Sequence, residues 1–173
     1  MAKIEILAPI IFQWEGGWAD HKNDRGGKTN MGVTLATWRS CGYDKDGDGD
    51  IDADDLRLIT REDVIELLRK HYWDRWKADQ IRDQSLANIL VDWVWASGKW
   101  GIIIPQRLLG ITADGKVGPV TLATLNQVNP KMFFLRLKEE RIKFCEDLCR
   151  KDPSQQVFLK GWINRINDFK YLG

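Results

Sequence analysis

Apolar side chains recur at helical spacing along most of this chain, and that periodicity limits it to a helical fold. Between residues 3 and 15 they follow one another at intervals of three and four, so they share one helix face. These residues are Ile4, Leu7, Ile11 and Trp14. Glycines and prolines separate similar stretches, which predict helices over residues 3–15, 35–41, 61–76, 86–97, 102–109, 119–126, 130–150 and 155–170. We therefore expect an all-α fold.

Composition excludes several classes of protein. The 26 Lys and Arg nearly balance the 25 Asp and Glu, and no basic run suggests nucleic acid as a partner. Cys41, Cys145 and Cys149 are odd in number and form no disulfide framework. No apolar run is long enough to span a membrane, and Glu5 lies inside the first apolar stretch. We expect a monomer of one or two compact parts, made in the cytoplasm without a signal peptide.

Residues 44–55 match the calcium-binding loop of EF-hands. Acids occupy loop positions one, three, five, nine and twelve, Gly49 stands at position six, where the chain must turn sharply, and Ile51 is the apolar residue at position eight. Alternating acids in a tight turn bring oxygens to one point, and Ca²⁺ takes six to eight oxygen ligands. The predicted metal ligands are Asp44, Asp46, Asp48, Asp50 and Asp55.

A run of acids is often only a solvated turn, but Gly49 and Ile51 both fall in register, which favours calcium. Asp55 stands where EF-hands usually carry a bidentate Glu, and in this it resembles the calcium loops of dockerin modules. The chain has one such loop, without a convincing pair of flanking helices. A calcium sensor opens through such a pair, so we expect a structural ion that orders the loop.

A second candidate site surrounds Glu15. This Glu stands at the predicted C-terminal end of an apolar helix, between Trp14 and Trp18. Apolar surroundings and the negative end of the helix dipole both favour the protonated carboxyl, as a general acid for glycoside cleavage requires. Gly16 and Gly17 let the chain leave the helix and a sugar approach closely. The simpler alternative is an ordinary Glu in the last turn of a helix.

The residues after Glu15 favour a catalytic acid over an ordinary Glu at a helix end. Glu15-Gly16-Gly17-Trp18, followed by residues 24–34 (Asp-Arg-Gly-Gly-Lys-Thr-Asn-Met-Gly-Val-Thr), resembles the signature of glycoside hydrolase family 108. These are phage-type lysozymes, or N-acetylmuramidases, in which the Glu of Glu-Gly-Gly is catalytic. The resemblance implies a lysozyme-like helical fold, Glu15 as the catalytic acid and bacterial peptidoglycan as the substrate.

Weaker likenesses extend over the rest of the chain, at residues 72–74, 92–98 and 161–162. Residues 114–121 look like the Asp-Gly-x-x-Gly-Pro-x-Thr segment of the family's predicted peptidoglycan-binding region. The chain departs from the family at Ala96, where the pattern has Asn, and at the calcium loop, which looks like an insertion. We expect residues 1–100 to form the catalytic region, with the calcium loop at 44–55, and residues 101–173 a small helical subdomain packed on it.

A glycosidase needs a second carboxylate beside the acid. The spacing from Glu15 to Asp24 resembles that of other phage lysozymes, in which a Thr completes the set, so Asp24 is the first choice and Thr29 and Thr34 are candidates for positioning water. Asp20 and Asp92 remain competitors. The predicted substrate contacts are Trp18, Asp92 and Ser97, and two further Trp are candidates for stacking on sugars. These are Trp95 and Trp100.

Three other functions are compatible with parts of the sequence. A module that binds the cell wall without cutting it would need residues 110–125 but no acid in an apolar setting. An enzyme for chitin or chitosan would use similar carboxylates. A calcium-regulated interaction protein would need more than one loop. The chain has both the 110–125 segment and Glu15 in an apolar setting, and it has only one calcium loop. We therefore expect cleavage of cell-wall glycan, after release or export by a route such as a phage holin.

Overall fold

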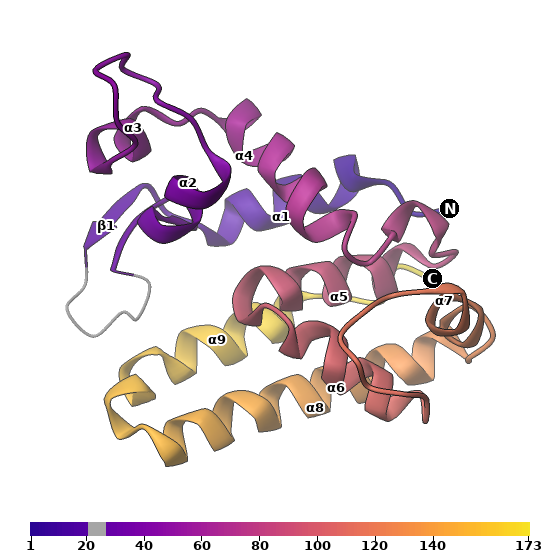
Figure 1. The fold of residues 1–173 in the computed structure, drawn as a ribbon. Helices are drawn as coiled ribbons and strands as arrows, with labels where there is room; N and C mark the ends of the chain where they lie inside the picture. Colours follow the sequence, from indigo (N-terminus) through magenta and orange to yellow (C-terminus); the bar gives the residue numbers. More distant parts are fainter. Residues whose placement is uncertain (21–26) are drawn as a thin grey trace. The chain divides into compact units, whose positions relative to one another are not determined.

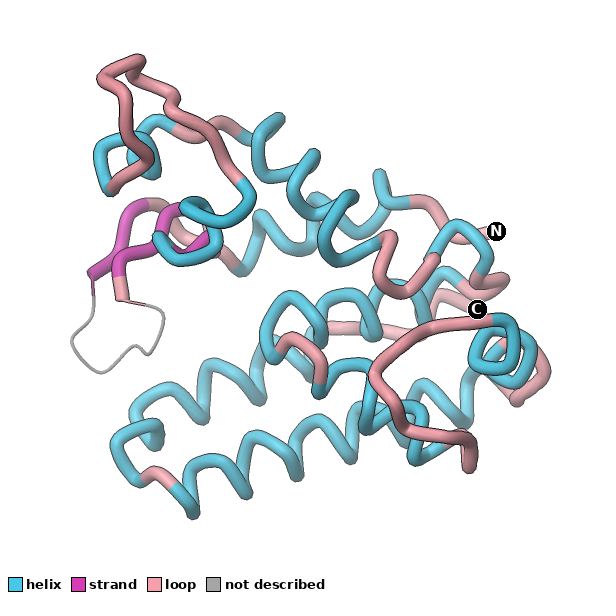
Figure 2. Tube along the Cα trace, viewed as in Figure 1, coloured by secondary structure: helices cyan, strands magenta, loops and turns pink. Residues whose placement is uncertain are grey.

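The computed structural model describes residues 1–20 and 27–173, and this part of the chain is mainly helical (Figures 1 and 2). It divides into two compact units. One comprises residues 8–69, and the other comprises residues 1–7 together with 70–173. Within the described ranges, no helix is both long and apolar enough to cross a membrane.

The unit of residues 8–69 contains most of α1 (Ile4–Trp14), a small sheet, and the helices α2 (Leu35–Cys41), α3 (Ala53–Leu58) and α4 (Arg61–Leu68). Side chains cap the starts of these three helices. Thr34 accepts a hydrogen bond from the backbone N–H of Thr37 at the start of α2. Reciprocal capping boxes open α3 and α4, the latter between Thr60 and Asp63.

The sheet has three short antiparallel strands, β1 (Trp18–Asp20), β2 (Lys28–Asn30) and β3 (Val33–Thr34), in the order β1-β2-β3. Trp18 lies opposite Asn30, which lies opposite Val33, so these three side chains share one face. Thr29 pairs with Ala19 on one side and Thr34 on the other, so these residues share the opposite face.

The larger unit is built on α5 (Gln84–Ser97), whose residues from 85 to 94 are all buried. It packs against α6 (Trp100–Leu108) and α8 (Pro130–Lys151), and α8 packs against α9 (Gln156–Asp168). A β-carbon on Gly101 would lie 2.5 Å from the backbone nitrogen of Val94, so the approach of α6 to α5 requires glycine there. The remaining elements are η2 (Ala78–Gln80), α7 (Pro119–Leu125) and η3 (Pro153–Gln155).

Residues 111–118, between α6 and α7, are organised by one buried amide. The Gln106 side chain donates to Asp114, to the Lys116 carbonyl and to Thr121, and it accepts from the Gly115 backbone N–H. Asp114 also accepts from the backbone N–H of Lys116. Asp114 and Thr121 therefore hold this turn in place.

Most ends of the helices expected from the sequence lie within two residues of the observed ends. Three features of the fold differ from the expectation. The described part of the chain is mainly helical as expected, but residues 18–20, 28–30 and 33–34 form strands, which are too short to show alternation in the sequence. The single helix expected over 61–76 ends as α4 and continues as a π-helical turn, η1 (Arg69–Trp73). A short helix, α3, follows the acidic loop, so helices flank the loop on both sides, where we expected no convincing pair.

Candidate functional site

Glu15 is the residue directly after α1. Its backbone N–H donates to the carbonyl of Ile11 at 2.9 Å, so it still belongs to the last turn of the helix. The side chain is half-buried. Gly16 and Gly17 follow, and a β-carbon on either would meet no atom within 4 Å. The carboxyl of Glu15 therefore stands at a helix end whose next two residues leave open space around the backbone.

The turn between β2 and β3 lies against the Glu15 side chain. A β-carbon on Gly32 would lie 2.5 Å from Cδ of Glu15 and 2.7 Å from both Cγ and Oε2. Gly32 also has a φ of +82°, which favours glycine. The sequence motif included Gly32 without assigning it a role. The signal was the pair Met31-Gly32, a two-residue connection of the kind that joins hairpin strands.

The two candidate Thr residues lie side by side across β2 and β3. The Thr34 hydroxyl accepts the backbone N–H of Thr37 at 3.1 Å and donates to the Thr37 hydroxyl at 2.9 Å. Thr34 is therefore engaged as the N-cap of α2. Thr29 is half-buried on the same sheet face.

The opposite face of the sheet is anchored to α3. The buried Asn30 side chain donates to the carbonyl of Leu56 at 2.9 Å and to that of Arg57 at 3.3 Å. The Arg57 guanidinium lies over the Trp18 ring, 4.2 Å from its centroid. Trp18 is thus partly covered by a cation in this geometry. Neither anchor was expected from the sequence, because Asn30 and Arg57 are 27 positions apart.

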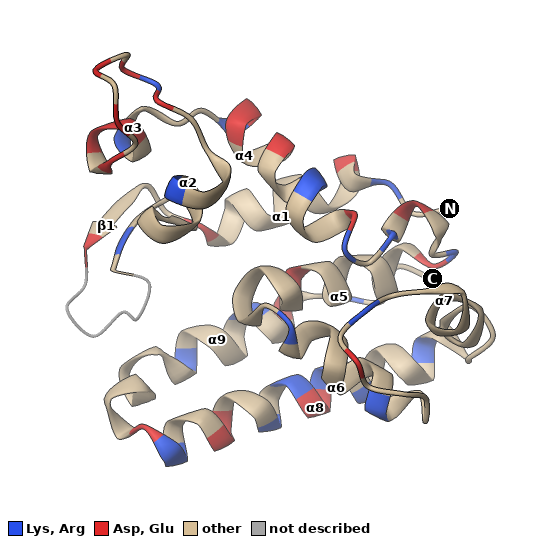
Figure 3. Ribbon diagram, in the orientation of Figure 1, with Lys and Arg blue, Asp and Glu red and all other residues tan. Residues whose placement is uncertain are grey.

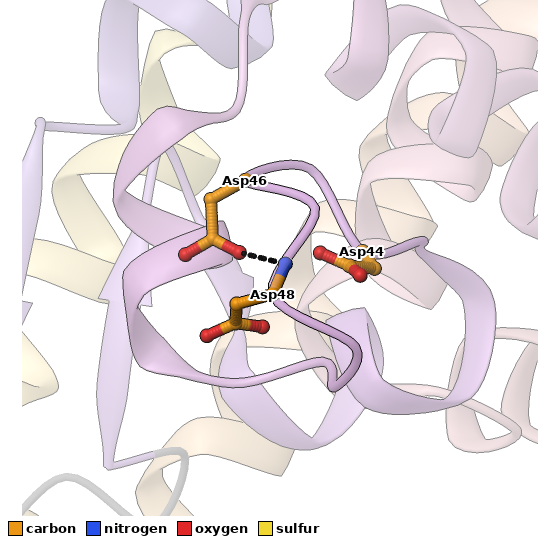
Figure 4. Close-up of side chains that lie close together, drawn as sticks. All are labelled: Asp44, Asp46 and Asp48. Atoms are coloured by element: carbon orange, nitrogen blue, oxygen red, sulfur yellow. Dashed lines mark hydrogen bonds between the residues drawn. The ribbon is translucent and has the colours of Figure 1, made fainter.

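The loop between α2 and α3 carries several acidic residues (Figure 3), and backbone N–H groups along it donate to its carboxylates, as Figure 4 shows for Asp46 and Asp48. Asp44 accepts backbone N–H groups from Gly47 and Gly49, and Asp46 accepts that of Asp48 at 3.1 Å. Gly49 has a φ of +102°, as the sharp turn at loop position six requires. Each of Asp44, Asp46 and Asp48 places a carboxylate oxygen within 4.8 Å of the other two.

Asp55 closes the loop from its far end. One carboxylate oxygen accepts the backbone N–H groups of Lys45 and Asp46, at 2.7 and 3.0 Å, and the other accepts that of Asp52 at 2.8 Å. The N–H of Asp52, together with those of Asp46 and Lys45, outweighs desolvation and lowers the pKa of Asp55. Asp55 is therefore ionised and fully buried, and it joins the beginning of the loop to the start of α3.

The carboxylates along the loop repel one another. The backbone N–H of Asp48 favours the ionised form of Asp46, but desolvation and the charges of Asp48 and Asp55 prevail and raise the pKa of Asp46 to about 6. The charge of Asp48, with desolvation, also raises the pKa of Asp50. A divalent cation bound among these groups would offset the repulsion.

Asp92, an expected substrate contact, lies in the larger unit and is fully buried. Arg165 donates to its Oδ1 at 2.6 Å, and Nη1 of Arg141 lies 2.8 Å from Oδ2 as an ion-pair partner. Desolvation is outweighed by the charges of Arg165 and Arg141, so the pKa of Asp92 is lowered. Asp92 thus links α5 to α8 and α9, and this geometry disfavours the expected contact with substrate.

The remaining candidates divide between the two units. Asp20 is exposed on β1, and Asp24 lies outside the described residues. Ser97 is half-buried at the end of α5 in the larger unit. There Trp95 contacts Tyr72, with ring centroids 4.9 Å apart, and Trp100 is 38% exposed.

Two protein-family models match this chain. A family model described as glycosyl hydrolase 108 matches residues 8–98, and one described as a predicted peptidoglycan domain matches residues 100–167. Of 11 matching solved chains, the structure of Brucella abortus SagA aligns with a TM-score of 0.79 and 25% identity, over 94% of this chain and 88% of that one. No curated protein matches significantly. Together the two models support peptidoglycan hydrolysis by a glycosidase. Since the first spans more than half of the sequence, the chain belongs to glycosyl hydrolase family 108.

Proposed function

We propose that this protein is a lysozyme-type N-acetylmuramidase that cuts the glycan strand of peptidoglycan, with Glu15 as the general acid. The observation that carries the proposal is the placement of Glu15. Its half-buried carboxyl follows α1 directly, beside two glycines and against the backbone of Gly32. The family membership and the peptidoglycan model at residues 100–167 supply the substrate class.

In the proposed reaction, Glu15 donates its proton to the glycosidic oxygen as the bond to the sugar breaks. A second carboxylate then acts as base, nucleophile or electrostatic partner. Asp24 keeps this role by its spacing from Glu15, with Asp20 on β1 as the competitor. Thr29, on the sheet face that it shares with Ala19, is the proposed residue that positions water.

We also propose that residues 1–100 supply the catalytic region and residues 101–173 hold the cell wall. Exposed or half-buried Trp side chains at the end of α5 and the start of α6 suit stacking on sugar rings, since flat apolar faces with polar edges complement sugars. They are Trp95 and Trp100.

A structural Ca²⁺ in the acidic loop completes the proposal. Asp44, Asp46 and Asp48 would supply side-chain oxygens, and Asp50 and Asp55 complete the proposed set. The bound ion would neutralise crowded carboxylates and order the loop. The turn at Gly49 and the convergence of three carboxylates support this reading.

The test is loss of turbidity of purified peptidoglycan, with mass spectrometry of the released fragments. Glu15→Gln keeps the shape of the side chain but removes the proton, and Glu5→Gln, on an exposed position of the same helix, is the matched control. We expect wild type and Glu5→Gln to release fragments with reducing-end muramic acid, and Glu15→Gln to be slower by ~10² or more.

Equal clearing by wild type and Glu15→Gln would remove Glu15 as the acid. Binding without clearing by wild type would instead favour a cell-wall-binding module. Release of fragments from chitin or chitosan, and not from peptidoglycan, would favour the other class of glycosidase.

A further inference from the structure

The backbone of Gly32 lies close against the side chain of Glu15. The distances of 2.5 and 2.7 Å from a β-carbon at Gly32 to Cδ, Cγ and Oε2 of Glu15 are shorter than any real β-carbon contact. Any residue but glycine would therefore displace the carboxyl group of Glu15 or move the turn. Glycine is needed here for space as well as for its backbone conformation.

The turn that presents Gly32 is held in an uncommon conformation. Asn30 pairs with Val33, so Met31 and Gly32 form a two-residue connection. Both have positive φ, +49° and +82°, the combination that type I′ hairpin turns require. A positive φ is rare for a residue such as Met. Such strain persists where the surrounding structure fixes it, and it gathers near functional sites.

Both residues that flank the turn are fixed. Val33 is 2% exposed. Asn30 is buried and bonded through its side chain to the last carbonyls of α3. The turn therefore cannot shift without breaking the hydrogen bonds of Asn30 or exposing Val33. The Glu15 side chain, in contrast, is the flexible partner, and an added β-carbon would push its carboxyl group aside.

We propose that Gly32 is a positioning residue for Glu15, and that the Met31-Gly32 turn fixes the place of the carboxyl group from which the proton is donated. The inference rests on the proposed function, because it assigns a role around the proposed acid. General acid catalysis requires the donor within hydrogen-bond reach of the leaving oxygen. A displacement of about 1 Å can cost ~10²-fold in rate.

The experiment compares Gly32→Ala with Gly110→Ala, a matched control. Gly110 has a φ of +73°, close to that of Gly32, but a β-carbon there meets no atom within 4 Å. Both variants carry similar backbone strain, and only the first crowds Glu15. Initial rates on peptidoglycan give kcat and KM, and thermal unfolding followed by circular dichroism gives the folded fraction and the Tm.

We expect similar falls in Tm for the two variants, so that Gly110→Ala reports the cost of the backbone strain. For Gly32→Ala we expect a fall in kcat of ~10²-fold, with little change in KM. In the double variant Glu15→Gln, Gly32→Ala, no further loss of kcat is expected beyond that of Glu15→Gln, because the position of an absent acid has no consequence. Should Gly32→Ala fail to fold, Gly32→Asn takes its place. Asn tolerates positive φ better and still carries the β-carbon.

Wild-type kcat in a folded Gly32 variant would overturn the proposal, and so would an additional loss of kcat in the Glu15→Gln background. Failure of the proposed function itself looks different. In that case Glu15→Gln alone retains full activity, whatever the Gly32 variants do.

Discussion

Replacing Asp92 with Asn should destabilise the protein severely while leaving the site around Glu15 untouched. The carboxylate is fully buried, and Arg141 and Arg165 lie at 2.8 and 2.6 Å with 4% and 14% of their side chains exposed. Removing the negative charge takes away the buried carboxylate that these two poorly solvated guanidinium groups share. Breaking a buried ion pair in this way costs about 3–5 kcal/mol.

For a chain of this size, each kcal/mol shifts Tm by about 2–4 °C, so we expect Tm to fall by roughly 6–20 °C. Thermal unfolding followed by circular dichroism measures the shift. The control is Asp147→Asn, which removes an Asp paired with Arg150 on α8 at the surface, where both partners are well exposed. That pair is solvated and screened, so its loss should leave Tm close to wild type.

The pH dependence follows from the direction of the Asp92 shift. Its pKa is lower in the folded protein than the usual value near 4 in the unfolded chain. The unfolded state therefore binds the proton more readily, and the stabilisation is complete above about pH 4 and lost as pH falls through the folded pKa. An Asp92→Asn variant with wild-type Tm but a raised KM would refute the structural role and restore Asp92 as a substrate contact.

Two further predictions concern the smaller unit. Millimolar Ca²⁺ should raise the Tm of wild type, chelation should reverse the effect, and Asp44→Ala with Asp48→Ala should abolish it; an equal response in that variant would contradict the calcium proposal. Thr34→Ala should lower stability by about 1 kcal/mol through loss of the α2 cap, while Thr34→Ser keeps the hydroxyl and the stability. If Thr34→Ala instead keeps its Tm but loses kcat, Thr34 positions water rather than the helix.

Helix positions in this chain could be predicted because they depend on local signals. Thr34 and Thr60 cap α2 and α4 as their sequences indicate, and Gly98 ends α5. The sheet could not be predicted from the sequence, because strands of two or three residues give too few positions for alternation to appear. Its stability comes from side-chain contacts with a helix distant in sequence, which no local pattern reports.

In the candidate site, too, local sequence patterns predict some features, while others depend on contacts between residues far apart in the sequence. The Glu-Gly-Gly motif pointed to Glu15, and the acid spacing of residues 44–55 pointed to a metal loop, because both patterns are contiguous. Asp92 looked like a polar residue available to substrate. Its two partners, Arg141 and Arg165, follow it by 49 and 73 positions. Only the packing of α5 with α8 and α9 brings the three charges together.

The acidic loop and the turn at Glu15 are parts of one hydrogen-bonded assembly. Asp55 ties the first residues of the loop to the start of α3, and the end of α3 holds the Asn30 side chain. Asn30 in turn is the last residue of β2 before the Met31-Gly32 turn. Order in the loop therefore supports the hairpin through α3, and the proposed ion would stabilise the turn beside the proposed acid by ordering the loop. A buried amide suits position 30 because its NH₂ group donates to the carbonyls of Leu56 and Arg57 in the last turn of α3, where carbonyls lack partners from a further turn of helix.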